Sequence, residues 1–431
     1  MDNRPSGQRD LLLKYALAVS LLLFAFVSPI SKSATYFPLF ASALFALLIR
    51  LRSAEGFHFP RGLKLLAGLW TAVLLWECVS VLANGGSITA TPFTRALYLL
   101  PAFLLAGLPL DIEWKKRTAA ASFLVVAATS ALIVLLGAYQ GATGVVYPFR
   151  VQPFSDGKLI GFFSHHIPAG GFFSTLVLMS ACLLLFWRTS TRLRLFLGIL
   201  LLLLFLGSLL SLSRTYLVSL CMTLPFLFFK KNLKAAVVGT SLIALIIAAS
   251  IAGLPPVKDR ISSIVDLKHN VSNLERLYLW RVARDMIEAN PVAGIGYRQW
   301  GEKISGYSVK YASEWKFSDA AFHHAHNVYL HVAAETGLVG LSLFLAFWLS
   351  VAVFLFRAST SPDDSGFIKA ITLGTAFAIV NFFIGGFFEN NFGTLLIALL
   401  ISYVLSLSFF VADGADAPNP DSSPAVCRGA R

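Results

Sequence analysis

The chain has 431 residues, of which 57% are hydrophobic and only 13% are charged. A soluble protein of this length needs much more charged surface, so the composition excludes the soluble globular classes. The net charge of +13 does not come from a basic tract with interleaved aromatic residues on a polar domain, which argues against a nucleic-acid partner.

Apolar residues fall in blocks of about 20 residues, the length that an α-helix needs to cross the hydrocarbon core of a bilayer. Membrane β-strands would instead show short alternating segments, so we predict an all-α, polytopic membrane protein. The first block is expected to remain in the protein as a signal anchor, because Lys14 interrupts the start of a cleavable signal peptide. About twelve transmembrane helices are predicted, over residues 12–30, 34–51, 63–83, 92–109, 118–138, 168–187, 193–211, 213–229, 235–253, 326–356, 367–388 and 392–411.

These blocks divide the chain into four predicted parts. Residues 1–253 hold nine helices, and residues 254–325 form a large polar loop that is long enough for a helical subdomain. Residues 326–411 hold the last three helices, of which the first is expected to begin with a short interfacial segment before a helix near Thr336. Residues 412–431 are rich in Pro, Asp, Ser and Ala and are predicted to be a disordered tail.

Basic residues at the ends of the blocks orient the bundle, because cytoplasmic loops are enriched in Lys and Arg. One set of connections carries clusters such as residues 115–117 and Lys230 with Lys231, whereas the opposite short connections hold isolated residues such as Lys32. We therefore predict a protein of the bacterial inner membrane with both termini in the cytoplasm. Residues 254–325 are then in the periplasm.

The histidines are concentrated on the predicted periplasmic side, where all of them except His58 fall. This distribution indicates a periplasmic active face, where there is no ATP and nucleotide-driven chemistry is excluded. The four cysteines show neither CxxC nor metal-ligand spacing. The histidines at 323, 324 and 326 likewise lack the i,i+4 spacing of a helical zinc site, so no metal and no cofactor are predicted.

His326 stands directly before an apolar block, in the segment His323-His324-Ala325-His326-Asn327. Continued helical spacing would place Gly337 on the same face, so that another helix could approach and His326 would point into the bundle at the membrane surface. A neutral imidazole there could take a proton from an incoming hydroxyl group. A metal site or a hydrated interfacial patch is the alternative. His331 and Glu335 are four residues apart and are expected to form an ion pair.

A second cluster opens with Ser272-Asn273-Leu274-Glu275, a capping-box pattern that predicts the start of a helix ending before Pro291. Arg276, Trp280 and Arg284 are spaced to share one face of it. The planar guanidinium of Arg276 suits a phosphate group, since it donates in pairs and stays charged. Equally, the helix could lie on lipid headgroups. The turn Gly294-Ile-Gly296 is only a weak sign of phosphate binding.

Two charged residues lie at or within apolar blocks. Arg214, in Ser211-Leu-Ser213-Arg-Thr-Tyr, is close to the hydrocarbon, where a charge is costly and marks either a site or a paired partner. Glu77 is the clearest intramembrane acid. Arg95, at the start of the next helix, is its expected partner in a structural pair.

Together these residues resemble the lipopolysaccharide O-antigen ligase family, which shares its pattern with O-antigen polymerases. The His-Asn motif with its Glu-Thr-Gly-Leu continuation is the most specific part of the resemblance, and the helix layout extends it over nearly the whole chain. In the Gly-Phe-Phe segment, where the family usually has His-Asn, this chain has His165-His166. The matching motifs are Gly161-Phe-Phe-Ser-His-His, Ser213-Arg214-Thr, Arg276 to Trp280 with Asn290-Pro291-Val-Ala-Gly294-Ile-Gly296, and His326-Asn327-Val-Tyr-Leu with Glu335-Thr-Gly337-Leu-Val-Gly340.

The resemblance implies a bundle like that of the glycosyltransferase-C enzymes and transfer of a glycan from undecaprenyl pyrophosphate to lipid A–core. It implies that the reaction needs neither metal nor nucleotide, because the pyrophosphate is already a good leaving group. It also implies that Arg214 and Arg276 bind the pyrophosphate and that His326 is catalytic. Further candidates for substrate binding are Asn327, Trp280, Arg95, His165 and His166.

Three rival functions remain open from the sequence. An O-antigen polymerase and a protein O-oligosaccharyltransferase would use the same donor with a different acceptor. A transporter would be expected to show charged residues near the membrane midplane and helices broken by paired Gly or Pro. Glu77 is nearly alone inside the membrane, and the polar residues gather at one surface. This pattern favours the ligase over transport.

Overall fold

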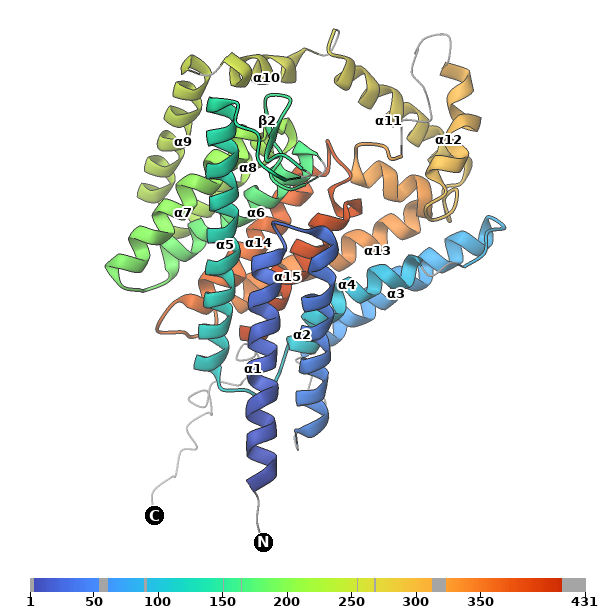
Figure 1. The fold of residues 1–431 in the computed structure, drawn as a ribbon. Helices are drawn as coiled ribbons and strands as arrows, with labels where there is room; N and C mark the ends of the chain where they lie inside the picture. The colour runs from blue at the N-terminus through green and yellow to red at the C-terminus, as the bar shows by residue number, and fades with distance from the viewer. Residues whose placement is uncertain are drawn as a thin grey trace, which may run out of the picture.

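The computed structural model describes residues 4–53, 61–88, 91–149, 151–163, 165–253, 255–266, 269–311 and 323–412 (Figure 1). Within these ranges the chain is almost entirely helical. The exception is a short antiparallel pair of strands, β1 (Phe154–Ser155) and β2 (Lys158–Leu159). The predicted all-α fold is confirmed.

Twelve apolar helices correspond one for one to the predicted blocks. In the described part of the chain, nine of them are long and apolar enough to cross a membrane, which confirms a multi-pass membrane protein. The shorter or more charged helices α4 (Thr91–Leu105), α8 (Arg214–Lys231) and α15 (Leu395–Val411) complete the twelve. The nine are α1 (Arg4–Val27), α2 (Lys32–Arg52), α3 (Arg61–Ala83), α5 (Ile112–Thr143), α6 (His166–Phe186), α7 (Thr191–Leu210), α9 (Leu233–Gly253), α13 (Val328–Ala358) and α14 (Phe367–Gly385).

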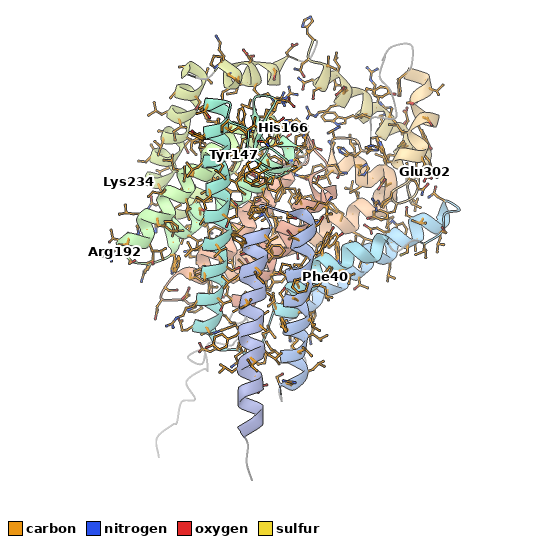
Figure 2. The ribbon with its side chains drawn as sticks, viewed as in Figure 1. Phe40, Tyr147, His166, Arg192, Lys234 and Glu302 are labelled. Carbon is orange, nitrogen blue, oxygen red and sulfur yellow. The ribbon has the colours of Figure 1, made fainter. Side chains whose placement is uncertain are left out.

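Three further helices lie across one end of the bundle, opposite the end where α1 begins (Figure 1). They are α10 (Pro255–Val265), α11 (Val271–Ala289) and α12 (Trp300–Ser308), and the 3₁₀ turn η1 (Val309–Tyr311) follows them. Figure 2 places His166 at this α10 end of the bundle. A small apolar core joins the segment to α13, with Leu279 and Met286 of α11, Trp300 of α12 and Ala334 of α13 among its buried members.

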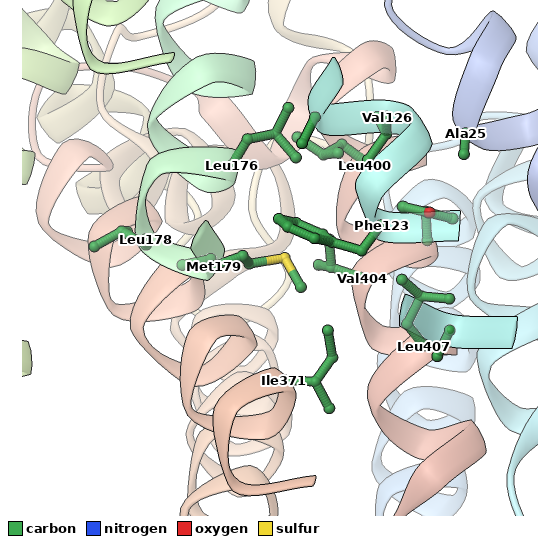
Figure 3. Packing of buried hydrophobic residues seen from close by; sticks show 14 of the residues in the cluster. Ala25, Phe123, Val126, Leu176, Leu178, Met179, Ile371, Leu400, Val404 and Leu407 are labelled. Atoms are coloured by element: carbon green, nitrogen blue, oxygen red, sulfur yellow. The ribbon is translucent and has the colours of Figure 1, made fainter. Parts of the chain in front are cut away.

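Helices α6 and α14 form the centre of the bundle, since 83% and 78% of the residues in their apolar stretches are buried. They approach closely where Gly374 of α14 faces Met179 of α6, since a glycine lets two helix backbones come together. Around them pack α5 and α15, and Figure 3 shows Phe123 of α5 between Leu176 of α6 and Val404 of α15. This dense core provides a fixed support for the loops at the α10 end.

The start of α11 differs from the prediction. Asn270 is the N-cap, and its side-chain oxygen accepts a hydrogen bond from the backbone N–H of Asn273. The capping box at Ser272 is therefore wrong by two residues, because Asn270 satisfies the free N–H groups of the first turn instead. The end of the helix at Ala289, before Pro291, is confirmed.

A break in α13 at Gly337, with φ 71° and ψ −178°, separates a short first segment from the long helix that follows. This confirms the predicted division near Thr336. The Gly294-Ile-Gly296 turn lies against the break, where the N–H groups of Ile295 and Gly296 donate to the carbonyl oxygens of Ala334 and Glu335 at 2.8 and 3.0 Å. Because those N–H groups are already in use, the turn does not form a phosphate loop.

Candidate active site

His326 lies outside helix α13, contrary to the prediction that it shares a helical face with Gly337. Its backbone adopts a positive φ of 46°, which a non-glycine residue rarely takes. Asn327 follows as the N-cap, and its side-chain oxygen accepts hydrogen bonds from the N–H groups of Tyr329 and Leu330, both at 3.0 Å. The helix therefore begins only after Asn327, and His326 precedes it. The imidazole is aimed by this turn instead of by helical spacing.

Glu389 is the partner of His326, and the sequence analysis missed it. Its carboxylate lies in the connection between α14 and the 3₁₀ turn η3 (Asn391–Gly393), is only 4% exposed, and accepts a hydrogen bond from Nδ1 of His326 at 3.0 Å. Burial by itself would raise the pKa of Glu389. The hydrogen bond from His326 comes first among the opposing effects, followed by electrostatic attraction to the two imidazoles and to Arg276, and together they outweigh burial and lower this pKa to about 2.

The ionised carboxylate fixes the tautomer of the imidazole. Because a carboxylate can only accept, Nδ1 of His326 must carry the proton of their hydrogen bond. In the neutral imidazole Nε2 is then left with a free lone pair, which is the state that a general base requires. The arrangement resembles the acid–histidine pair of hydrolytic triads, in which the acid orients the ring and stabilises its protonated form.

His324 completes a cluster with this pair. Its Nε2 lies 3.8 Å from Oε1 of Glu389, and its ring centre lies 4.2 Å from that of His326. Donor atoms of the three side chains lie within 4.8 Å of one another, and in the described ranges they form the group that could hold one metal ion. Two imidazoles and one carboxylate suit zinc. The direct hydrogen bond between His326 and Glu389 satisfies two of the same atoms without an ion.

The burial of His324 makes the stability of the protein depend on pH. Burial, followed by the neighbouring charge of His326, lowers the pKa of His324 from 6.5 to about 3. As the pH falls below 6.5, the unfolded chain takes up a proton at this position that the folded protein refuses, so stability is lost on acidification. We expect the free energy of unfolding, measured by thermal unfolding, to fall less steeply from pH 7 to pH 5 in His324→Gln than in the wild type. The difference in slope should be up to about 1 kcal/mol per pH unit.

A matched control for this measurement is His269→Gln, since the side chain of His269 is 85% exposed and pairs with the partly exposed Asp266. The control should keep the slope of the wild type. Equal slopes in the wild type and both variants would contradict a buried, neutral His324.

Arg214 begins α8 and is 7% exposed. Its Nη1 donates to the carbonyl oxygen of Ser263 at 2.8 Å and to the side-chain oxygen of Asn270 at 3.4 Å. These contacts hold the start of α8 against α10 and the N-cap of α11. Across the described ranges no carboxylate forms an ion pair with Arg214, so its buried charge is solvated by polar groups but not neutralised.

Arg276 is half-buried on α11, and Nη1 donates to Ser272 at 3.3 Å. Its Nε is buried and has no hydrogen-bond partner among the described residues. Burial lowers the pKa of Arg276, while the negative charges of Glu389 and then Glu275 oppose that effect. The guanidinium thus lies near the His326–Glu389 pair with part of its donor capacity unused.

The two interpretations of α11 can now be separated in part. The helix buries one face against α12 and α13, so it does not lie flat on lipid headgroups. The predicted common face of Arg276, Trp280 and Arg284 is only partly correct, because Arg284 is exposed and pairs with Glu288 at 2.6 Å. Trp280 is half-buried, and its Nε1 has no hydrogen-bond partner within the described chain.

A third arginine, Arg260 of α10, also lies at this site and was not predicted. Its Nε donates to the carbonyl oxygen of Leu212 at 2.8 Å, and its Nη2 lies 3.4 Å from Nε2 of His166. Burial lowers the pKa of Arg260, and repulsion from Arg276 lowers it further. His165 is the N-cap of α6, and its ring centre is 4.1 Å from that of His166. The structure therefore places both histidines beside the arginines.

The remaining predicted residues have more local roles. Asn327 uses both ends of its carboxamide, since Nδ2 donates to the carbonyl oxygen of Phe387 at 3.2 Å while the oxygen caps α13. The expected ion pair of His331 and Glu335 is confirmed at 3.6 Å. The side chain of Arg95 lies outside the described residues, so its pairing with Glu77 stays a prediction.

An aromatic cavity of about 230 Å³ lies between α3, α4, α13 and α15. It borders Val328 and Asn390, which lie two residues and one residue along the chain from the two members of the His326–Glu389 pair. Its polar lining includes Glu77, His331, Glu335 and Asn390, and its aromatic lining includes Trp70, Trp76, Phe344 and Trp348. Indole and phenyl faces together with carboxylate and amide groups suit a ligand with both apolar and hydroxyl surfaces.

A family model described as O-antigen ligase matches residues 199–345 of the chain. The match runs from α7 into α13 and includes Arg214, Arg260, Arg276 and His326. Over these residues the chain is similar to the O-antigen ligase family. Among curated proteins none matches the chain. Members of this family are glycosyltransferase-like membrane proteins with lipid-linked glycan and lipid acceptor partners. Glu389 lies outside the matched range.

Proposed function

We propose that the protein is an O-antigen ligase that transfers a glycan from undecaprenyl pyrophosphate to a sugar hydroxyl of lipid A–core, at the periplasmic face of the bacterial inner membrane. The observation that carries the proposal is the hydrogen-bonded His326–Glu389 pair beside arginines that have no acidic partner among the described residues. A histidine oriented as a base and a cationic pocket are the two groups that transfer from a pyrophosphate requires.

Arg214 and Arg276 would bind the pyrophosphate of the donor. Their guanidinium groups stay charged even when buried, and they donate to phosphate oxygens in pairs. When the glycan leaves, negative charge grows on the pyrophosphate, and fixed positive charges in a half-buried site stabilise it strongly. The leaving group is already activated, so the proposed reaction needs neither nucleotide nor metal.

His326 would act as the general base. Its Nε2 takes the proton of the acceptor hydroxyl as the acceptor oxygen forms a bond to the anomeric carbon. The bond from that carbon to the phosphate oxygen breaks, and its electron pair stays on the phosphate. Glu389, through Nδ1, stabilises the imidazolium that results.

The aromatic cavity is the proposed entry of the acceptor. Trp70, Trp76 and Trp348 in its lining could stack on sugar rings, and the amide of Asn390 could hydrogen-bond to sugar hydroxyls. Donor and acceptor would then reach His326 from different environments, one rich in arginine and one rich in aromatic side chains. We further place α10–α12 in the periplasm as a subdomain within residues 254–325, and both termini in the cytoplasm, as the distribution of basic residues predicts.

The test is an in vitro transfer assay with purified protein, lipid-linked O-antigen and rough lipopolysaccharide, with chelator and without nucleotide. We expect a glycan ladder on lipopolysaccharide from the wild type and none from His326→Ala or Arg276→Ala. Matched controls are His269→Ala and Arg284→Ala, because both side chains are exposed. Lengthening of the lipid-linked glycan would identify a polymerase, and a glycosylated protein acceptor would identify a protein O-oligosaccharyltransferase. No product with any acceptor would overturn the proposal.

A further inference from the structure

We infer that Arg260 is a third phosphate ligand of the donor site, which binds the phosphate group that becomes more negative when the glycan departs. The inference rests on the proposed function and adds to it a residue that contacts the leaving group. Its basis is the geometry that joins Arg260 to Arg214, together with the charge of the cluster that these residues form with Arg276.

Reciprocal hydrogen bonds place Arg260 beside Arg214. Arg260 donates from Nε to the carbonyl oxygen of Leu212, and Arg214 donates from Nη1 to the carbonyl oxygen of Ser263, both at 2.8 Å. The two acceptors are close in sequence to the opposite donors, and Ser263 is itself hydrogen-bonded to the carbonyl oxygen of Arg260 at 2.7 Å. The start of α8, with the turn before it, and the middle of α10 are thus joined twice, so the two arginines lie side by side.

The cluster of Arg214, Arg260 and Arg276 holds positive charge that no ion pair among the described residues neutralises. Neither Arg214 nor Arg260 nor Arg276 forms an ion pair within the described ranges, although all three are buried or half-buried. Glu389, the carboxylate that acts most strongly on Arg276, is already hydrogen-bonded to His326. Gathering like charges away from water is costly, so such a cluster indicates an anionic ligand.

Three arginines match the charge of the product better than that of the substrate. The donor is a pyrophosphate esterified at both ends, which carries two negative charges. Cleavage of the anomeric carbon–oxygen bond leaves the electron pair on the terminal phosphate, so that the pyrophosphate keeps one ester only and gains a third negative charge near neutral pH. A guanidinium that binds this group interacts more strongly as the reaction proceeds, and an interaction of that kind raises the rate of the chemical step.

Part of Arg260 is free to make this contact. Its Nε is committed to Leu212 and one Nη2 hydrogen faces His166, which leaves Nη1 and the second Nη2 hydrogen for phosphate oxygens. His166 is only 6% exposed, and its Nε2 lies 3.4 Å from Nη2 of Arg260. A purely positioning role, in which Arg260 only holds the Leu212 turn, is the alternative. It would affect all ligands of the donor site alike.

The experiment measures how purified full-length protein binds undecaprenyl pyrophosphate and undecaprenyl monophosphate. The variants are Arg260→Gln and Arg260→Lys, and the control is Arg284→Gln on the exposed face of α11. We expect Arg260→Gln to weaken pyrophosphate binding roughly tenfold and monophosphate binding less than about twofold, since a charge-assisted bidentate contact is lost for one ligand only. Arg260→Lys should fall between, because lysine keeps the charge but not the fork. Thermal unfolding of each variant checks that it is folded.

Two results would overturn the inference. Equal weakening of both ligands would make Arg260 a positioning residue, and unchanged binding of both would remove it from the site. If Arg260→Gln does not fold, the same comparison applies to Arg260→Lys. A wild type that binds pyrophosphate and makes the glycan ladder, with Arg260 variants that do not discriminate, refutes this inference alone. A wild type that binds no polyprenyl pyrophosphate refutes the proposed donor as well.

Discussion

Replacement of Glu389 by glutamine is expected to lower the transfer rate by about 10²–10⁴-fold, close to the effect of His326→Ala. Glutamine keeps the shape of the side chain, but its neutral amide no longer requires a proton on Nδ1 of His326. The ring can then take the other tautomer, in which Nε2 carries the proton and cannot act as a base. The charge that stabilises the imidazolium is lost in the same variant.

The double variant Glu389→Gln with His326→Ala provides the sharper measurement. If the carboxylate acts only through the imidazole, the double variant should be no slower than His326→Ala alone, because residues that work as a unit have non-additive effects. The readout is the initial rate of glycan transfer at saturating donor and acceptor. Additive losses would mean that Glu389 contacts a substrate directly. A wild-type rate in Glu389→Gln would remove it from the mechanism.

Two controls separate orientation of the histidine from general damage and from metal binding. Glu288→Gln changes an exposed acid that pairs with Arg284 and should leave the rate unchanged. His324→Ala removes one of the three donors of the candidate metal group but not the hydrogen bond between Glu389 and His326. A mild effect of His324→Ala supports orientation by Glu389, whereas a loss as severe as that of Glu389→Gln, together with inhibition by chelator, would favour a required metal ion.

The helices were predictable because their signal is independent of packing. An apolar block long enough to cross the bilayer must satisfy its backbone groups internally, and a helix is the way to do so within one segment. The short or charged helices α4, α8 and α15 were found by the same criterion. The break at Gly337 could also be predicted, since small residues and a Thr-Gly pair interrupt an otherwise apolar block there.

Helix starts were less predictable because several residues compete to cap the same turn. Asn270 and Ser272 are both good caps two residues apart, and the sequence favoured the capping box at Ser272. In the folded protein Asn270 also accepts from Arg214, a residue far away along the chain, and this tertiary contact decides the choice. Asn327 similarly caps α13 and leaves His326 in a turn.

The sequence analysis identified the basic residues of the candidate site but not its acidic residue, Glu389. Arg214, Arg276 and His326 stand out because charged or titratable groups beside apolar blocks are costly. Glu389, an acid in the polar break between the last two apolar blocks, carried the same signal and could have been found by it. Arg260 could not, since it is one of several charges in a polar loop, and only its contacts with Leu212 and His166 distinguish it.

Gly337→Ala is expected to destabilise the protein by about 3 kcal/mol or more. A methyl group at this position would overlap the carbonyl oxygen of Val292, and the backbone φ of 71° disfavours a side chain as well. Relaxation is blocked because Leu338 donates to the carbonyl oxygen of Pro291 at 2.8 Å, so the connection between α11 and α12 is fastened to the break itself. A methyl group added at Gly294, on the same connection, would in turn clash with the backbone at Glu335.

The measurement is the thermal unfolding midpoint of purified protein in detergent, with Gly301→Ala as the matched control. Gly301 lies in α12, and an added methyl there has nothing within 4 Å, so the control should be neutral or slightly stabilising. Because the first segment of α13 begins directly after His326 and Asn327, a Gly337→Ala protein that folds should also shift His326 away from Glu389 and transfer glycan more slowly. An unchanged midpoint in Gly337→Ala would mean that the segments around Gly294 and Gly337 do not pack as closely as the structure has them. The placement of His326 just before the start of α13 would then lose its main support.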